Sequence, residues 1–160
     1  MSNFVPNNKF KTVVEYAPLI SIDIIVKYEN KILLGKRINK PAKEYYFTTG
    51  GIIRKNESFK EAQKRITNDE LGIELDKELK FIGIFEHFYN DSIFNNICTH
   101  YVNHAYLLEL DKLLEDLPKD QHESYKWFTL NELLKSEKVH EYTKDYFTNL
   151  KTGESKKNEK

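Results

Sequence analysis

The sequence predicts an α+β protein, and the order of its segments is the main reason. Short runs rich in Ile, Val and aromatic residues are separated by turn residues, which is typical of β-strands. One segment in the middle of the chain, residues 58–70, has clear helix boundaries, and two helical segments follow the last strand. Several strands, one helix, further strands and then helices is the order expected of an α+β sandwich.

Length and composition indicate one domain over residues 1–150, with a charged, flexible tail over 151–160. A chain of 160 residues can bury a core without disulfide or metal staples, and its 39% hydrophobic and 31% charged residues are typical of a globular protein. The 25 basic and 25 acidic residues cancel, so nothing indicates general attraction to nucleic acid or membranes. A single cysteine and the lack of any membrane-spanning apolar run favour a cytoplasmic protein.

The elements follow from local pattern. Strands are predicted over 19–28, 32–37, 45–47, 79–88, 99–109 and 125–128, and helices over 7–16, 58–70, 130–134 and 139–150. Residues 48–51 are expected to form a loop and residues 112–123 a loop or short helix. Asp23 is an acid inside an otherwise apolar strand, where it needs a partner or water, so it is a candidate functional residue.

The central helix carries paired carboxylates. Ser58 and Glu61 have capping-box spacing, and Gly72 is a natural C-terminal cap. At about 100° per residue, Asp69 and Glu70 share a face with position 66, and such carboxylates suit Mg²⁺. Arg65, four residues before Asp69, is expected to form an ion pair with it or to brace the neighbouring loop. The Gly50-Gly51 pair before the helix lets the backbone approach a metal or phosphate closely.

The segment Gly51–Ile73 resembles the Nudix box, the signature of Mg²⁺-dependent hydrolases of nucleoside diphosphates linked to another group. The matching positions are Gly51, Glu57, Arg65, Asp69-Glu70, Gly72 and Ile73. The resemblance implies the Nudix fold, a mixed β-sheet sandwiched between helices. Position 66, usually a glutamate in the box, is Ile66, and the loss of one carboxylate favours a single bound metal.

A narrower resemblance links the chain to the GDP-mannose mannosyl hydrolases, a branch of the same family. That branch has an apolar residue and then Thr after the arginine of the box, as Arg65-Ile66-Thr67 does here. Further matching fragments are Pro18–Asp23, Leu34–Arg37 with Asn39 and Pro41-Ala42, His87–Tyr89, Thr99–Tyr101, Asp120–His122 with Tyr125 and Trp127, Val139-His140 and Tyr146-Phe147. Together they extend the resemblance over roughly residues 10–153.

This resemblance implies a mechanism in which water attacks C1 of the sugar, inverts it, and releases GDP and free sugar. One Mg²⁺ per subunit, with Mn²⁺ as a substitute, would be held by Gly50, Glu70 and Gln121, with Asp69 as a further candidate. His122 would be the general base, a role suited to a pKa near neutrality. Asp23, Arg37 and Arg65 would assist catalysis, and Arg37, Tyr101, His87 and Asp23 would contact the nucleotide sugar.

One position departs from that branch, and two other hypotheses stay open. Ile52 stands where the mannosyl hydrolases carry an arginine that helps to stabilise the departing diphosphate. The chain could instead be an ordinary Nudix pyrophosphatase that cuts the diphosphate of a nucleotide sugar, or a catalytically impaired nucleotide-sugar binder. Ile66 favours the sugar-releasing reaction, whereas Ile52 favours the binder. The resemblance also implies a homodimer.

Overall fold

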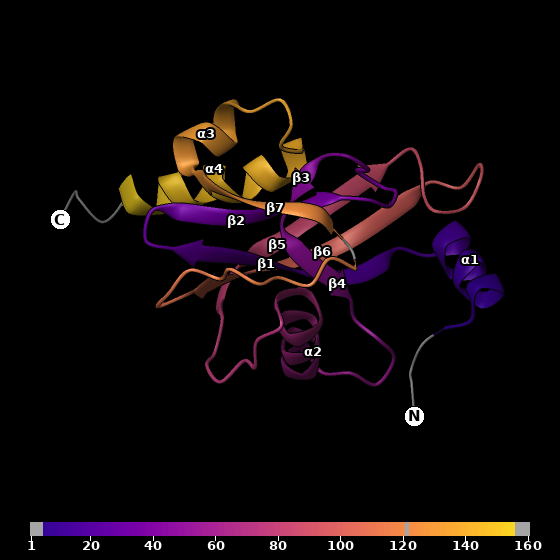
Figure 1. The fold of residues 1–160 in the computed structure, drawn as a ribbon. Coiled ribbons are helices and arrows are strands. Elements are labelled where there is room, and N and C mark those ends of the chain that lie inside the picture. The colour runs from indigo at the N-terminus through magenta and orange to yellow at the C-terminus, as the bar shows by residue number, and fades with distance from the viewer. Residues whose placement is uncertain (1–4, 121, 156–160) are drawn as a thin grey trace.

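The fold is a mixed β-sheet with helices on both faces, as predicted (Figure 1). A computed structural model describes residues 5–120 and 122–155. In Figure 1 the helix α2 lies below the sheet, α3 and α4 lie above it, and α1 lies beside one end. The strands are β1 (Leu19–Tyr28), β2 (Lys31–Arg37), β3 (Tyr46–Phe47), β4 (Thr49–Ile52), β5 (Lys80–Tyr89), β6 (Thr99–Glu109) and β7 (His122–Thr129). The helices are α1 (Asn7–Tyr16), α2 (Phe59–Leu71), α3 (Leu130–Lys135) and α4 (Glu141–Ser155).

Strand β1 is the centre of the sheet and shares one of its edges between two partners. Its C-terminal end pairs with β2 in an antiparallel hairpin, from Val26↔Leu33 to Tyr28↔Lys31. Its N-terminal half pairs instead with β4, and its other edge runs parallel to β6. Because β2 leaves β1 where β4 joins it, residues from all three strands border one opening in the sheet.

Alternate residues of β1 enter two separate cores. Ile22, Ile24 and Val26 pack with α2 residues such as Ile66, whereas Ile25 packs against the α3 and α4 side of the sheet. Burial on both faces explains why this strand is apolar along most of its length. It also puts Asp23, which has the parity of Ile25, on the side of the sheet that α4 covers.

Most predicted elements are confirmed, and the differences concern residues 49–52, the start of β7, the 112–123 segment and the start of the last helix. Residues 49–52, expected in a loop, form β4, because pairing with β1 outweighs the low strand propensity of two glycines. Strand β7 begins at His122, three residues before the predicted strand at 125. Within the described part of the 112–123 segment no helix forms, and the last helix begins at Glu141 rather than at residue 139.

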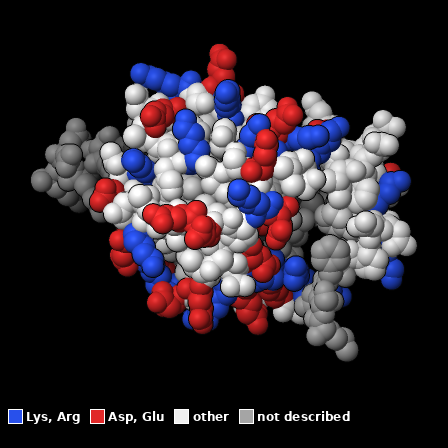
Figure 2. All heavy atoms as spheres, viewed as in Figure 1, with Lys and Arg blue, Asp and Glu red and all other residues white. Residues whose placement is uncertain are grey.

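The surface matches the neutral composition of the chain. Figure 2 shows Lys and Arg interspersed with Asp and Glu over the face in view, without a large field of one sign. Among the described residues, no helix has the length and apolar character needed to cross a membrane.

Candidate active site

A cavity of about 940 Å³ opens where β1, β2 and β4 diverge, which is large enough for a nucleotide-sized ligand. Every predicted site residue that the structure describes lines it: Asp23, Arg37, Gly50, Arg65, Asp69, Glu70, His87, Tyr101 and His122. These residues come from strands β1, β2 and β4 to β7 and from helix α2. Gln121, the remaining predicted metal ligand, lies outside the described residues.

Asp23 and Gly50 face one another across the β1–β4 pair. A Cβ at position 50 would collide with Asp23 Oδ1 and would lie 2.7 Å from the Ile22 carbonyl oxygen, so only glycine leaves room for the carboxylate. Burial raises the pKa of Asp23 to about 6, while a hydrogen bond from Tyr146 opposes that shift. Asp23, an acid in the middle of a buried strand, therefore has a hydrogen-bond partner, the Tyr146 hydroxyl.

His122 is a buried residue at the start of β7, and not part of the loop or short helix predicted over residues 112–123. Its side chain is 3% exposed, and its ring lies over Gly35, where a Cβ would be only 2.5 Å from the ring carbons. Nδ1 lies 3.3 Å from Tyr125 Oη and 3.5 Å from Glu70 Oε2. Nε2 is also buried and has no hydrogen-bond partner among the described residues.

The pKa of His122 is lower than the near-neutral value that the role of general base suggested. Burial, with the neighbouring Arg37 charge, lowers the pKa of His122 to about 4, so the ring is neutral at pH 7. If Nδ1 carries the proton toward Glu70 and Tyr125, Nε2 has a free lone pair. His100 Nε2 and His104 Nδ1 are likewise buried without a partner in the described part of the chain, so what distinguishes His122 as the candidate base is its place in the cavity.

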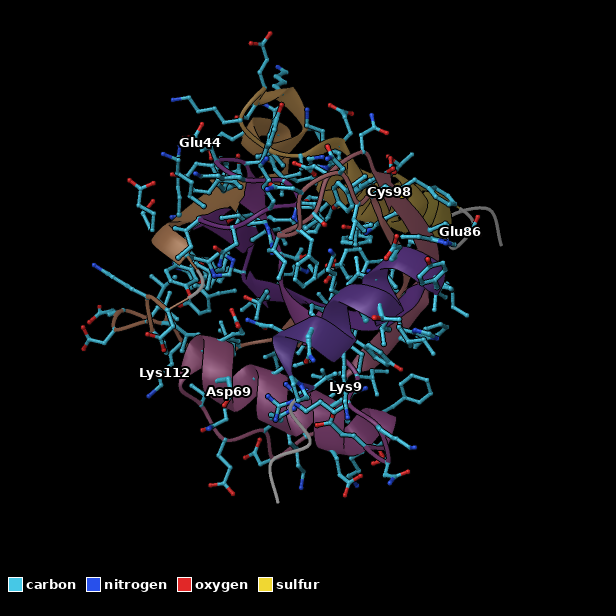
Figure 3. The ribbon with its side chains drawn as sticks, turned by 90° about the vertical axis from the view of Figure 1, so that its right-hand side faces the viewer. Lys9, Glu44, Asp69, Glu86, Cys98 and Lys112 are labelled. Carbon is cyan, nitrogen blue, oxygen red and sulfur yellow. The ribbon has the colours of Figure 1, made fainter. Side chains whose placement is uncertain are left out.

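Glu70 is the carboxylate best suited to a divalent cation. Its side chain is 12% exposed, and burial raises its pKa to about 7 against the opposing charge of Arg37. A buried carboxylate oxygen together with backbone carbonyl oxygen is a donor set that suits Mg²⁺. Asp69, in contrast, lies at the surface of α2 (Figure 3).

The described residues by themselves do not form a closed metal cage. Among residues 5–120 and 122–155, no group of three His, Cys, Asp or Glu side chains is close enough to hold an ion. Position 66, which carries a third carboxylate in the usual box, is filled by Ile66, 1% exposed and packed beneath Gly51. The residues thus fit one ion that also takes oxygen ligands from the backbone, from substrate or from water.

Arg65 pairs with Glu57 and not with the predicted Asp69. Its Nε and Nη2 donate to the Glu57 carboxylate at 2.6 and 2.9 Å, and Nη2 also donates to the Ile52 carbonyl oxygen at 2.9 Å. Glu57 in turn accepts from the Arg54 backbone N–H at 2.8 Å. Arg65 therefore ties the loop between β4 and α2 to the helix, which is the bracing role that the sequence allowed.

Substituting Glu57 by Gln is expected to lower the free energy of unfolding by about 2 kcal/mol, because a partly buried, bidentate ion pair is lost. Glu57 is 10% exposed in its side chain, whereas Glu109 is 66% exposed and pairs with Lys27. Glu109→Gln is therefore the matched control, with an expected change of about 0.5 kcal/mol or less. Urea unfolding of both variants measures the difference, and equal effects would contradict this account.

The same substitution has a pH dependence with a defined sign. The hydrogen bond from Arg65 lowers the pKa of Glu57 below its ordinary value of 4.5. A carboxyl with a depressed pKa stabilises the folded state above its unfolded pKa and loses that contribution as the pH falls through the folded value. The stability gap between wild type and Glu57→Gln should thus be full near pH 7 and shrink below about pH 4.5.

Arg37, Tyr101 and His87 complete the polar part of the cavity. Arg37 of β2 lies opposite His122 of β7 in the strand register. Its Nε donates to the Pro41 carbonyl oxygen at 2.9 Å. His87 is 3% exposed, and burial lowers its pKa to about 4, so it is neutral at pH 7. Burial also raises the pKa of Tyr101, which therefore keeps its phenolic proton.

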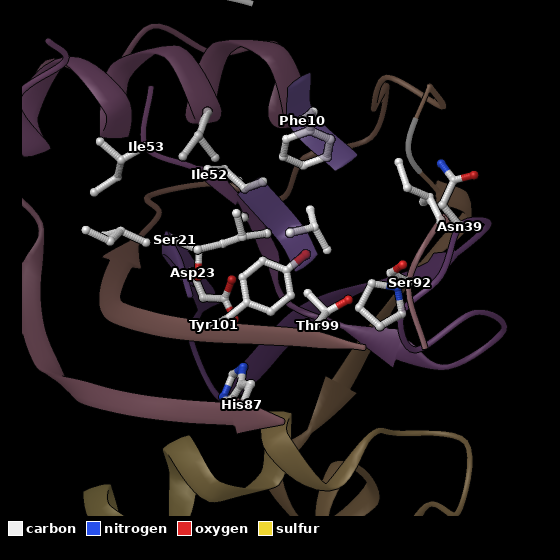
Figure 4. Close-up of a pocket in the computed structure, with 18 of the residues that line it drawn as sticks. Phe10, Ser21, Asp23, Asn39, Ile52, Ile53, His87, Ser92, Thr99 and Tyr101 are labelled. Atoms are coloured by element: carbon white, nitrogen blue, oxygen red, sulfur yellow. The ribbon is translucent and has the colours of Figure 1, made fainter. Parts of the chain in front are cut away.

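The other end of the cavity is apolar. Ile52 packs in a cluster with Phe10 and Val14 of α1, Leu19 of β1 and Tyr101 of β6. Figure 4 shows the Tyr101 ring with Ile52 and Phe10 on one side and His87 on the opposite side. At the position where the mannosyl hydrolases are expected to have an arginine, this chain thus uses an aliphatic side chain to dock α1 on the sheet.

Sequence reasoning missed several residues that shape the site. Tyr125 donates to the Pro118 carbonyl oxygen at 2.7 Å and approaches both His122 and the Glu70 carbonyl oxygen. Tyr146 and Asn103 form a buried network behind Asp23. Asp120 lines the cavity, and its charge acts to raise the pKa of Glu70. The only available signal was that Asp120, Tyr125 and Tyr146 fall in the fragments shared with the mannosyl hydrolases.

Comparison with known proteins agrees with this geometry. A family profile described as the NUDIX domain matches residues 18–150. The low-salt glycan biosynthesis protein Agl8 of Haloferax volcanii is 36% identical over 126 residues, which cover 78% of this chain and 79% of Agl8. An ADP-ribose pyrophosphatase of Methanocaldococcus jannaschii is 34% identical over 68 residues, or 42% of this chain and 40% of that protein.

A solved structure shares the fold. The MutT NUDIX hydrolase of Burkholderia pseudomallei superposes with a TM-score of 0.68 at 23% identity, over 83% of this chain and 98% of that chain. A mixed sheet between helices, with a box helix at the edge of a polar cavity, defines the class, and the profile match covers most of the chain. This protein belongs to the Nudix family of hydrolases.

Proposed function

We propose that this protein is a Mg²⁺-dependent hydrolase of a nucleotide sugar, of the GDP-mannose mannosyl hydrolase type. Water attacks C1 of the sugar, the bond from C1 to the diphosphate oxygen breaks, and a nucleoside diphosphate leaves with the free sugar. The observation that carries the proposal is the meeting of Asp23, Arg37, Glu70 and His122 in one cavity, beside a box helix with Ile66 in place of a third carboxylate.

The proposed roles follow from the position of each group. His122 takes a proton from the attacking water at Nε2, because the other ring nitrogen faces Glu70 and Tyr125. Arg37 and Tyr101 bind the diphosphate, and Asp23 and His87 bind sugar hydroxyl groups in the same cavity. Arg65 acts indirectly, because its contacts brace the loop that follows Gly50 and Gly51.

The metal would be held by Glu70, the Gly50 carbonyl oxygen and Gln121, with Asp69 as an outer candidate. A divalent ion there supplies charge that stabilises the departing diphosphate. The buried Glu70 carboxylate, whose pKa is raised by burial, supports this assignment because a cation would offset its cost of desolvation. Mn²⁺ suits the same oxygen donors and is expected to substitute.

The likeness to Agl8 supports a sugar substrate, since that protein's name assigns it to glycan biosynthesis. The shorter match to an ADP-ribose pyrophosphatase favours the alternative, an ordinary pyrophosphatase that attacks phosphorus. The two reactions differ in which bond water enters. Hydrolysis of GDP-mannose in ¹⁸O-labelled water with Mg²⁺ separates them directly.

The expected products are unlabelled GDP and mannose that carries ¹⁸O at C1. Label in a phosphate, with GMP and mannose 1-phosphate as products, would replace the proposal by the pyrophosphatase function. Tight binding of nucleotide sugars by calorimetry, with no turnover at any Mg²⁺ concentration, would identify a binder. A panel of nucleotide sugars in the same assay identifies the base and the sugar that the protein prefers.

Ile52→Arg is expected to loosen helix α1 rather than to speed up turnover. The guanidinium would enter the apolar cluster with Phe10 and Val14, at a cost of about 2 kcal/mol. Hydrogen exchange of the α1 amides should accelerate by roughly tenfold or more, and kcat should not rise. Ile52→Leu, which keeps the apolar contact, is the control. A gain of tenfold or more in kcat for Ile52→Arg would instead indicate a restored diphosphate contact.

The same family likeness leads us to propose a cytoplasmic homodimer with one metal ion per subunit. Light scattering coupled to gel filtration measures the mass in solution. A mass near 19 kDa, that of one chain, would contradict the dimer without affecting the proposed reaction.

A further inference from the structure

Polar side chains replace apolar ones in the core beneath α4. On that side of the sheet the cluster formed by Ile25, Ala105, Phe128 and Leu133 is fully apolar. Next to it, Ser21, Asp23 and Asn103 are at most 8% exposed. Three buried polar side chains on adjacent strands need mutual hydrogen bonds, and the parallel β1–β6 register brings Ser21 opposite Asn103.

These groups form one directed chain of hydrogen bonds that ends on a carboxylate. Ser21 Oγ donates to Asn103 Oδ1 at 2.9 Å, and Asn103 Nδ2 donates to Tyr146 Oη at 2.6 Å. The Tyr146 hydroxyl, from α4, donates to Asp23 Oδ2. Each donor is turned toward the next acceptor, so the bonds polarise one another, and the last of them is strengthened by the carboxylate charge.

The two oxygens of Asp23 are therefore in different environments. Oδ2 accepts the hydrogen bond from Tyr146. Oδ1 lies against Gly50, and it fits there only because glycine has no side chain. A carboxylate fixed at one oxygen cannot rotate without breaking that bond. Tyr146 is fully buried and its ring packs edge-on against Phe85 at 4.8 Å, so the hydroxyl is itself held in place.

We propose that Tyr146 is a positioning residue: by holding Asp23 Oδ2 it aims Oδ1 at the sugar of the bound nucleotide sugar. The proposal rests on the proposed function, in which Asp23 binds the sugar. It assigns to the C-terminal helix a part in sugar recognition, although Tyr146 does not line the cavity. It also predicts that Tyr146 acts chiefly through Asp23 and only on ligands that carry a sugar, because the other site residue near its hydroxyl, His87 with Nε2 at 3.4 Å, is also assigned to the sugar.

Tyr146→Phe tests this, because it removes one hydroxyl and keeps the ring in the core. Tyr142→Phe is the matched control, since Tyr142 lies one turn earlier on α4 and its hydroxyl bonds to the backbone of Phe88 instead, at 3.0 and 2.9 Å. For Tyr146→Phe we expect kcat for the nucleotide sugar to fall by roughly 10–100-fold. Tyr142→Phe should stay within about threefold of wild type in every measurement.

Binding measurements separate positioning from general loosening. By calorimetry, Tyr146→Phe should weaken GDP-mannose about tenfold while GDP, which has no sugar, binds within about twofold of wild type. In an Asp23→Asn background, Tyr146→Phe should cause little further loss, because the partner of its hydroxyl is already altered. Full kcat in Tyr146→Phe, equal weakening of GDP and GDP-mannose, or additive effects in the double variant would each overturn the proposal.

These outcomes are distinct from failure of the proposed function. If the wild type cuts the diphosphate, ¹⁸O labelling reports it, and the comparison of GDP with GDP-mannose still tests whether Tyr146 controls sugar binding. If the wild type releases GDP and Tyr146→Phe does so at the same rate, only the role of Tyr146 is overturned.

Discussion

His122→Gln is expected to lower kcat by about 10²–10⁴-fold while substrate binding changes little, because glutamine is of similar size but cannot accept the proton of water. The ring of His122 sits over Gly35 and lines the cavity, so the replacement fits the same space. Single-turnover kinetics measure the chemical step, and calorimetry measures the affinity for the nucleotide sugar.

His104→Gln is the control for this experiment. His104 is also a strand histidine, but it packs against Phe59 at 5.0 Å and does not line the cavity. It should keep wild-type kcat within about threefold. A small effect of His122→Gln on kcat would remove His122 from the role of base and would leave its unpartnered nitrogen unexplained.

Glu70→Gln is expected to reduce Mg²⁺-dependent turnover by about 10³-fold, because the substitution removes the buried charge that would bind the ion. The side chain keeps its size and one oxygen, so folding should be preserved. Titration of activity with Mg²⁺, and of Mn²⁺ binding by electron paramagnetic resonance, should both move to higher metal concentration.

Two further acids show whether this effect belongs to Glu70. Glu74→Gln changes an exposed acid four residues along the chain and should have no effect on metal binding. Asp69→Asn, at the surface of α2, should cost less than tenfold. If Asp69→Asn equals or exceeds Glu70→Gln, then the main metal ligand is Asp69 and the orientation of the ion in the cavity is different.

The elements that sequence predicted well are those with local physical causes. Helix α2 has the predicted reciprocal cap between Ser58 and Glu61, and Gly72 adopts φ 68° at its end. Backbone donors and left-handed residues at helix ends are determined within a few positions, so spacing alone reveals them. The long apolar run of β1 is equally local, and its bounds are as predicted.

What sequence could not predict depends on contacts between distant segments. The Thr-Gly-Gly sequence of β4 is typical of a turn. It forms a strand because it pairs with the edge of β1. Arg65 has Asp69 four residues away, yet the loop before α2 folds back and presents Glu57 at closer range. The burial of His122 has no local signal at all, because Asp-Gln-His-Glu is a polar sequence and the ring is covered by tertiary structure.

The parallel pairing of β1 with β6 has a consequence for how the protein is made. Residue pairs from Leu19↔Tyr101 to Lys27↔Glu109 join segments far apart in the chain, and Tyr146 must then dock from still further along. Pairings with such long loops form slowly, and they cannot form on the ribosome before the later segment has emerged. The segment with the whole box helix therefore leaves the ribosome before it can build the cavity, and Asp23 acquires its buried partner only after the later segment that carries Tyr146 has emerged.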